Sequence, residues 1–237
     1  MNLQLPLTLV LKDGATFDSY YAGPNGEAVA HLRKLTGTPW EPGMYLWGGP
    51  GTGKSHLLQA VCHAAGERGV AAVFLPMRAA DQFPREALQG LEKVGIVCID
   101  DIHAIAGDYD WELAVIDLFE RIRETGGILV VTGNAMPAQL GLQLTHLVSR
   151  LAWGLQLQLQ ALNEVDKLSA LQLRASRRGI SLPSESGRYL IRHYGSDMHP
   201  LFSALESLDR ASLAAKRRLT IPFLREVLKD IDTGESF

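Results

Sequence analysis

The stretch LWGGPGTGKSHLLQAV, residues 46–61, decides the fold of this chain. Its centre, residues 48–55, matches the phosphate-binding pattern G-x-x-x-x-G-K-[ST] at every position. The apolar run 44–47 before it predicts a buried strand, and the apolar periodicity after it predicts a helix that stops at Gly69. Glycines let backbone N–H groups converge on phosphate oxygens, and a helix N-terminus adds the positive end of its dipole. The sequence therefore predicts a phosphate cradle between a strand and a helix.

Strand and helix patterns continue to alternate after this cradle. The apolar runs at residues 70–76, 95–100 and 127–134 predict buried strands, and the segment 84–94 between the first two predicts a helix. Residues 154–160 alternate apolar and polar side chains, which is typical of an edge strand. Strands that alternate with helices indicate an α/β fold with a doubly wound parallel sheet.

The pattern changes class near residue 162, after which every periodic segment is helical. Ser184 is expected to cap one of these helices, and Leu201, Leu205 and Leu208 form an apolar stripe on the next. At the other end, Pro6 disfavours a helix, so the first residues are expected to form an extended arm. The predicted organisation is an arm at 1–15, an α/β base at 16–161 and a small all-α lid at 162–237.

The bulk composition excludes several classes of protein. The chain has 237 residues, of which 46% are hydrophobic, and its formal net charge of −3 is unlike that of a strongly basic nucleic-acid binder. Its two cysteines, Cys62 and Cys98, lie in apolar runs and are expected to be buried and reduced. No run approaches the length of a membrane span, and no secretion signal is evident, so a cytoplasmic location without a membrane partner is expected.

Polar side chains follow two of the predicted buried strands. Asp100 and Asp101 end the first, where Asp100 with the hydroxyl of Ser55 could hold Mg²⁺ and Asp101 could polarise an attacking water. Asn134 ends the next strand, where its amide could orient water or contact a γ-phosphate. The alternatives are an acidic turn for the aspartates and an ordinary turn residue for Asn134.

With these motifs and a trailing helical region, the chain resembles the AAA+ superfamily of P-loop ATPases. TFDSYYAGPN (residues 16–25) resembles the adenine-pocket segment of the bacterial initiator DnaA, which implies that Tyr21 contacts the nucleotide. LVSRLAWG (147–154) resembles the motif with the arginine finger, here Arg150, which would act in trans on a neighbouring subunit's ATP. The resemblance covers roughly residues 16–230. The residues it implies at the nucleotide are Gly48, Gly49, Pro50, Gly51, Thr52, Gly53, Lys54, Ser55, His56, Tyr21 and His199.

His199 is a departure from the initiator pattern. It occupies the place, within SDMHPLF, where initiators carry an arginine that touches the nucleotide. Because an ordinary histidine is mostly neutral near pH 7, it should hold a γ-phosphate poorly. The expected cofactors are therefore ADP (or ATP) and Mg²⁺.

The N-terminal arm carries a second departure. Gln4, Leu5, Leu7 and Leu9 fit a Q-L-x-L-x-L pattern, which resembles the peptide that docks replication proteins on the β sliding clamp of DNA polymerase III. By itself, the alternation also suits an ordinary strand. The initiator's N-terminal domain and helix-turn-helix domain have no counterpart in the pattern. This combination is similar to the Hda family of regulatory DnaA inactivators, as is the stretch LDRASLAAKRRLTIPFLREVL.

The resemblance implies a regulator that acts with DNA-loaded clamp to stimulate hydrolysis of DnaA-bound ATP and so represses re-initiation of replication. Its partners would be DnaA and the clamp, with DNA contacted only indirectly, at the nucleoid. Its own ATPase would be weak if present, and self-association is compatible with the family. The alternative is a DNA-acting AAA+ ATPase such as a helicase loader. A third class, a small-molecule P-loop kinase, is disfavoured because no stretch outlines its substrate pocket.

Overall fold

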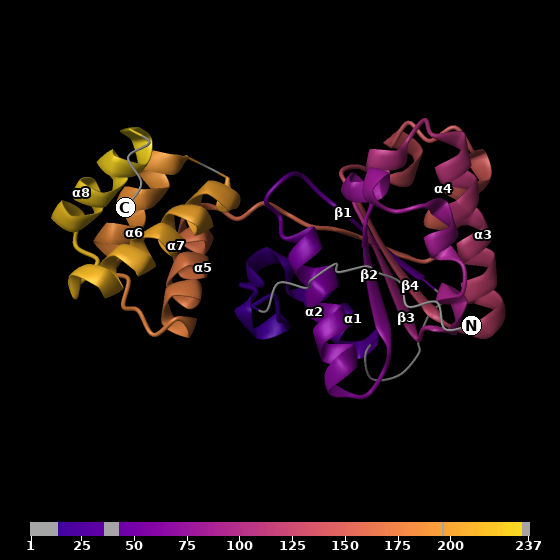
Figure 1. Cartoon of the computed structure of the whole chain (residues 1–237), viewed down its shortest axis with the longest axis horizontal. Coiled ribbons are helices and arrows are strands. Elements are labelled where there is room, and N and C mark those ends of the chain that lie inside the picture. Colours follow the sequence, from indigo (N-terminus) through magenta and orange to yellow (C-terminus); the bar gives the residue numbers. More distant parts are fainter. Residues whose placement is uncertain (1–13, 36–42, 196, 234–237) are drawn as a thin grey trace. The chain divides into compact units, whose positions relative to one another are not determined.

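The structure is a computed structural model that describes residues 14–35, 43–195 and 197–233, with side chains described as far as residue 228. The chain divides into two compact units, Met1–Gln160 and Ala161–Phe237. The first unit is an α/β base and the second is a bundle of helices (Figure 1). The predicted fold class, a parallel α/β base followed by a helical lid, is confirmed.

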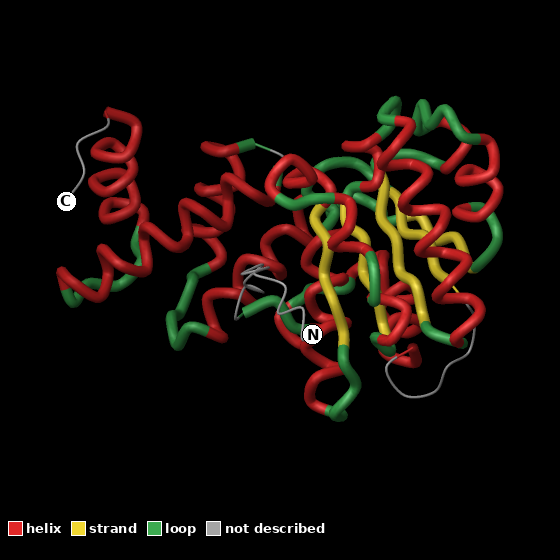
Figure 2. The backbone as a smooth tube through the Cα atoms, turned by 45° about the vertical axis from the view of Figure 1, so that its right-hand side comes forward, coloured by secondary structure: helices red, strands yellow, loops and turns green. Residues whose placement is uncertain are grey.

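The base is built on one five-stranded parallel sheet (Figure 2). The strand order is β2-β3-β4-β1-β5, so the chain crosses from β1 to the edge strand β2, returns through β3 and β4 to the side of β1, and adds β5 on the other side of β1. β1 pairs with β4 in the register Trp47↔Gly133, and β3 pairs with β4 in the register Ile99↔Val131. The strands are β1 (Gly43–Trp47), β2 (Ala72–Pro76), β3 (Ile96–Asp100), β4 (Ile128–Gly133) and β5 (Leu155–Gln158).

The burial of the strands explains their composition. Every residue of β3 and β4 is buried, because helices cover both faces of the sheet at its centre. β5 pairs only with β1 and alternates half-buried and exposed residues, as expected for an edge strand. The predicted strands at the centre and at the edge of the sheet are thus confirmed.

Helices pack on both faces of the sheet (Figure 1). One face is covered by α1 and α2, whose buried Leu32, Leu57 and Val61 pack against Leu46 and Val130 of the sheet. The other face is covered by α3 and α4, which belong to a second core cluster. Their bounds are α1 (Gly26–Leu35), α2 (Lys54–Glu67), α3 (Tyr109–Thr125) and α4 (Thr145–Leu151).

One predicted helix of the base is wrong. The segment 84–94 forms two short 3-10 turns, Arg85–Leu88 and Leu91–Lys93. Gly90 lies between them at φ 83°, a left-handed conformation that ends one turn before the other begins. The apolar periodicity of the segment reflects burial in the core, since Ala87, Leu88 and Leu91 are buried. The other 3-10 turns are Phe17–Ser19, Gly23–Asn25, Met77–Gln82, Ile102–Ile105 and Pro137–Gln139.

Both cysteines are free and buried, as predicted, Cys62 on α2 and Cys98 on β3. None of the helices in the described part of the chain is long and apolar enough to cross a membrane.

The second unit contains four helices within its described residues. The predicted stripe of Leu201, Leu205 and Leu208 is fully buried in its core. Ser184 does not cap its helix: Pro183 occupies the N-cap position, and Ser184 is the first helical residue. Its hydroxyl instead accepts a hydrogen bond from Gln172 at 3.3 Å. The helices are α5 (Glu164–Arg177), α6 (Ser184–Tyr194), α7 (Met198–Ala215) and α8 (Ile221–Thr233).

Gly154, at the start of β5, permits a close approach of two strands. A Cβ there would lie 2.4 Å from the carbonyl oxygen of Gly43 on β1. We expect Gly154→Ala to destabilise the base by about 1–3 kcal/mol, because backbone atoms must move. Gly66→Ala on α2 is the control, since a Cβ there meets nothing within 4 Å. Thermal unfolding of both variants checks this, and equal melting temperatures would contradict it.

Candidate functional site

The phosphate-binding loop connects β1 to α2. It leaves the sheet after Trp47, and α2 begins at Lys54. Gly51 and Gly53 adopt φ of 72° and 89°, conformations that residues with a Cβ rarely adopt. A Cβ on Gly48 would lie 2.5 Å from the carbonyl oxygen of Leu159, so the loop lies directly against the chain after β5. The predicted cradle therefore has the backbone shape that phosphate binding requires.

Lys54 is a buried cation inside this loop. Its Nζ donates to the carbonyl oxygens of Gly48 and Gly49, at 2.7 and 2.9 Å. Burial lowers the pKa of Lys54, and the carboxylates of Asp101 and Asp100 oppose that shift. The ammonium group is thus held at the cradle with anions nearby, where it can meet the outer phosphates of a nucleotide.

Ser55 and Asp100 meet at the carboxyl edge of the sheet. The Ser55 hydroxyl hydrogen-bonds the Asp100 carboxyl, and Thr132 on β4 donates to the same carboxyl at 2.7 Å. Burial raises the pKa of Asp100, and these two hydrogen bonds oppose the shift. A hydroxyl and a carboxylate side by side are the oxygen donors that Mg²⁺ prefers, so the pair fits a nucleotide-bound magnesium ion.

Asp101 is held differently from its neighbour. It has φ 53°, one of two positive values among the described non-glycine residues, and its N–H donates to the Thr132 hydroxyl at 2.9 Å. Its carboxylate pairs with Arg78 Nε at 2.5 Å, and the ring of His103 lies 3.8 Å away. Arg78 thus holds one carboxylate oxygen, Oδ2, and the other, Oδ1, lies on the side of His103.

Thr132 and Arg78 are site residues that the sequence did not predict. Thr132 is fully buried and bridges Asp100 and the backbone of Asp101, whereas the predicted Asn134 is exposed and lies one residue beyond β4. A polar residue inside an otherwise apolar strand was the available signal for Thr132. No local signal marks Arg78, because only strand pairing brings it to Asp101.

The segment from Thr16 to Asn25 packs against the cradle. Tyr20 donates its hydroxyl to the carbonyl of Thr52 at 2.9 Å, and burial raises the pKa of Tyr20 to about 12. His56 Nε2 lies 2.9 Å from the carbonyl oxygen of Thr16, and its ring is 5.5 Å from that of Tyr20. Tyr21, predicted to contact the base, is half-buried next to this assembly. Tyr20 therefore attaches this segment to the cradle, a contact that the sequence did not predict.

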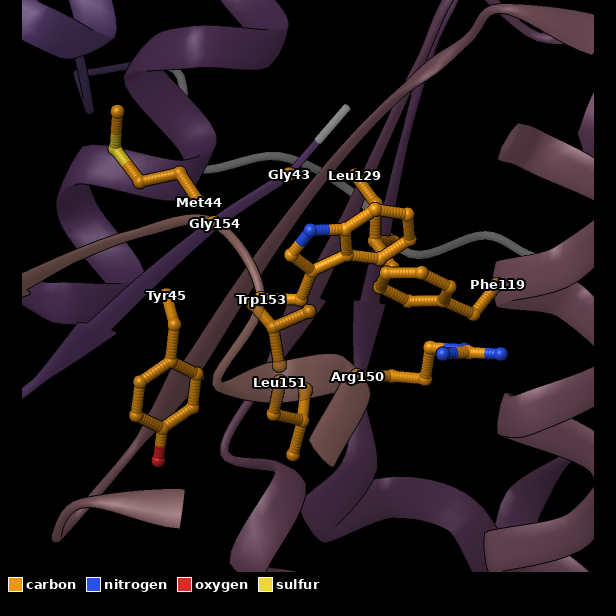
Figure 3. A pocket seen from close by; sticks show the side chains of 10 residues that line it. Gly43, Met44, Tyr45, Phe119, Leu129, Arg150, Leu151, Trp153 and Gly154 are labelled. Atoms are coloured by element: carbon orange, nitrogen blue, oxygen red, sulfur yellow. The ribbon is translucent and has the colours of Figure 1, made fainter. Parts of the chain in front are cut away.

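Arg150 lies at the opposite end of the sheet from the cradle. Together with Trp153 it lines a small hollow whose other residues include Gly43 and Met44 at the start of β1 and Gly154 before β5 (Figure 3). β1 is five residues long, so about 16 Å of strand separates this edge from the loop. An arginine side chain cannot span that distance, and Arg150 therefore cannot serve the nucleotide bound by its own chain.

Arg150 is paired within the chain. Its Nε donates to Glu120 on α3 at 2.5 Å, and its guanidinium carbon lies 5.7 Å from the ring centroid of Trp153. Its side chain is 33% exposed and that of Glu120 is 28% exposed. Ion pairs this exposed stabilise a fold by about 0–1 kcal/mol, so a strong anion can compete for the guanidinium.

The remaining predicted residues lie in the second unit or outside the described residues. His199 is exposed at the start of α7 in the second unit, where its N–H donates to the N-cap Asp197 at 3.0 Å. Gln4, Leu5, Leu7 and Leu9 lie outside the described residues. The prediction of each as a contact residue stays a prediction.

Asp100→Asn tests the buried carboxylate. Because the pKa of Asp100 is raised in the folded state, its ionised form opposes folding, and the stability present when it is protonated is lost as the pH rises. We expect Asp100→Asn without nucleotide to melt at or above the wild-type temperature at pH 7. The difference should vanish as the pH falls below about 4.

The same variant should lose the additional stabilisation that Mg²⁺ gives to the complex with ADP or ATP. Differential scanning fluorimetry at several pH values, with and without Mg²⁺ nucleotide, measures both effects. A variant that melts well below wild type at pH 7 would show that ionised Asp100 supports the fold instead.

Family models match both units of the chain. A model described as the bacterial DnaA ATPase domain matches residues 11–158, and one described as the Hda lid domain matches residues 164–228. The first match spans more than half of the chain and includes the cradle, the acidic pair and Arg150.

Solved structures of DnaA share the fold. Domain III of the Thermotoga maritima replication initiation protein DnaA superposes with a TM-score of 0.78 at 21% identity, over 92% of this chain and 97% of that chain. AMPPCP-bound DnaA from Aquifex aeolicus gives 0.71 at 18% identity, over 83% of this chain and 65% of that one. A DnaA bound to AMPPCP and single-stranded DNA gives 0.74 at 17% identity, over 94% and 71%. With the cradle, the acidic pair and the two model matches, this chain belongs to the Hda/DnaA-related family of AAA+ proteins.

Proposed function

We propose that this protein stimulates hydrolysis of the ATP bound by DnaA, acting together with the DNA-loaded β sliding clamp, and so represses re-initiation of replication. Arg150 would stabilise the transition state on the γ-phosphate of the DnaA-bound ATP. The observation that carries the proposal is the position of Arg150. It lies at the edge of the sheet remote from its own cradle, half-exposed beside Trp153, which is 53% exposed.

An arginine in that position could reach a nucleotide only if another chain holds it. The guanidinium group is permanently charged and presents a planar fork of donors, which suits phosphate oxygens better than a lysine does. A large exposed aromatic next to an arginine is also typical of the residues that anchor protein interfaces. The match of the second unit to the Hda lid model favours DnaA as that other chain.

The chain's own cradle would serve a structural purpose in this proposal. Lys54, Ser55 and Asp100 would hold ADP or ATP with Mg²⁺. The lysine and the metal ion would neutralise the negative charge of the phosphates. We expect weak turnover at this site, where Arg78 holds one oxygen of the Asp101 carboxylate. The proposed place of action is the replisome at the nucleoid, in the cytoplasm.

The proposal is tested by following the nucleotide on DnaA. Wild-type protein, clamp loaded on DNA and DnaA with radiolabelled ATP should convert the label to ADP. Arg150→Ala should reduce that rate by about 10³-fold, and Arg150→Lys should not restore it. Gln4→Ala should also lose the stimulation, because the protein could then no longer dock on the loaded clamp.

The control for this experiment is Arg85→Ala, which removes an arginine paired with Asp108 and Asp110 elsewhere in the base. It should stimulate like wild type. Vigorous ATP turnover by the protein without DnaA, unaffected by Gln4→Ala, would instead support a DNA-acting motor such as a helicase loader.

His199→Arg tests nucleotide preference. A neutral imidazole gives little attraction to a γ-phosphate, so we expect wild type to bind ADP at least as tightly as ATP. Arginine at this position should strengthen ATP binding relative to ADP, because it adds a permanent charge. Isothermal titration calorimetry with both nucleotides measures the ratio, and a strong ATP preference in wild type would refute the expectation.

A further inference from the structure

Glu120 on α3 holds two arginines at once. Its Oε1 accepts the Nε–H of Arg150 at 2.5 Å, and its Oε2 forms an ion pair with a terminal nitrogen of Arg123 at 2.6 Å. Both guanidinium carbons also lie near one ring, Trp153, at 5.7 Å for Arg150 and 5.6 Å for Arg123. Each carboxylate oxygen therefore has its own cation, so Glu120 is fixed by Arg123 while it holds Arg150.

The atom through which Arg150 is held decides what the contact can do. A guanidinium group has five N–H donors, one on Nε and four on the two terminal nitrogens. Across the described residues, the structure records a hydrogen bond of the Arg150 side chain only through Nε. The terminal fork, which is the part that binds a phosphate bidentately, stays available for a ligand.

The backbone that carries Arg150 is also set by α3. Glu112, which is fully buried, accepts hydrogen bonds from the backbone N–H groups of Gln143 and Leu144 at 3.0 and 2.8 Å, directly before α4. In Figure 3, Arg150 extends toward the helix that carries Phe119, which is α3. One helix thus places both the start of α4, through Glu112, and the guanidinium group at its end, through Glu120.

We propose that Glu120 is a positioning residue for Arg150: its carboxylate fixes the Nε edge of the guanidinium group so that the terminal fork faces the γ-phosphate held by the partner chain. This inference rests on the proposed function. Without the carboxylate, the long side chain would sample several rotamers, and the fork would meet the phosphate only part of the time.

The hollow that Arg150 and Trp153 line is too small to be a ligand site that would explain why charged side chains gather around Glu120. Its volume is about 10 Å³, which is room for a single water molecule, and its walls are mostly apolar. Trp153 is one of its lining residues and is itself 53% exposed. The hollow therefore has no room for a ligand that would account for the polar groups of the cluster.

The test measures stimulated hydrolysis of DnaA-bound ATP over a range of protein concentrations. Glu120→Ala should lower the rate at saturation by about 10- to 100-fold and leave the half-saturating concentration within about twofold of wild type. Glu120→Gln keeps an oxygen that can accept the Nε–H, so it should retain most of the rate. Glu124→Ala, on an exposed residue of the same helix, is the matched control.

A double-mutant cycle assigns the effect to Arg150. Glu120→Ala should cause no further loss in an Arg150→Ala background, because the group that it positions is then absent. In parallel, the ¹⁵Nε signal of Arg150, identified by its loss in Arg150→Lys, should shift and exchange faster in Glu120→Ala and remain near its wild-type position in Glu120→Gln.

The outcomes separate the two proposals. If wild type fails to stimulate DnaA, the proposed function is wrong and the positioning role falls with it. If wild type stimulates but Glu120→Ala is unchanged or faster, the carboxylate does not position Arg150 and only this inference is overturned. A rise in the half-saturating concentration alone, with the saturated rate intact, would assign Glu120 to partner binding and would also overturn it.

Discussion

The hydrogen bonds that join β3 to β4 at their carboxyl ends are the constraint on which the site depends. Thr132 is the central group: its hydroxyl donates to Asp100 and accepts from the backbone of Asp101. Because the strands are parallel and adjacent, this contact brings the acidic pair to the edge where β1 delivers the loop with Lys54 and Ser55. A slip of the register by one residue would turn these side chains to the other face of the sheet.

The two acidic residues have different environments because of this contact. Asp100 is buried and is engaged by two hydroxyls, and burial raises its pKa, so a metal ion would have to stabilise the ionised form that it binds. Asp101 takes a left-handed backbone conformation and faces Arg78. Non-glycine residues in this conformation cost of order 1–3 kcal/mol and often occur at functional sites, where the surrounding structure holds them. Here the Thr132 hydroxyl, which binds the backbone N–H of Asp101, and Arg78, which binds its carboxylate, hold Asp101 in this conformation.

The base carries the cradle and the Arg150 cluster at opposite ends of the same sheet. The cradle occupies the carboxyl edge, whereas Arg150, Glu120 and Trp153 cluster near the amino ends of β1 and β5. Such a separation suits an assembly in which a nucleotide lies between chains, since each chain then gives its cradle to one interface and its arginine to another. Glu112 connects the chain before α3 to the chain before α4, because its buried carboxylate accepts hydrogen bonds from the backbone N–H groups of Gly107 and Gln143.

The fold class, the cradle and the acidic pair were predictable from the amino-acid sequence because each has a local signal: a periodicity, a glycine-rich loop, or two neighbouring aspartates at the end of an apolar run. Prediction failed for residues 84–94, where the periodicity suits an amphipathic helix but Gly90 divides the segment into two turns. Only the tertiary structure decided that Thr132, rather than Asn134, meets the acidic pair and that Arg78 faces Asp101. The tertiary structure alone also paired Arg150 with Glu120, 30 residues away along the chain. These contacts join separate strands and helices, and their formation depends on strand order and packing, which no short stretch of residues encodes.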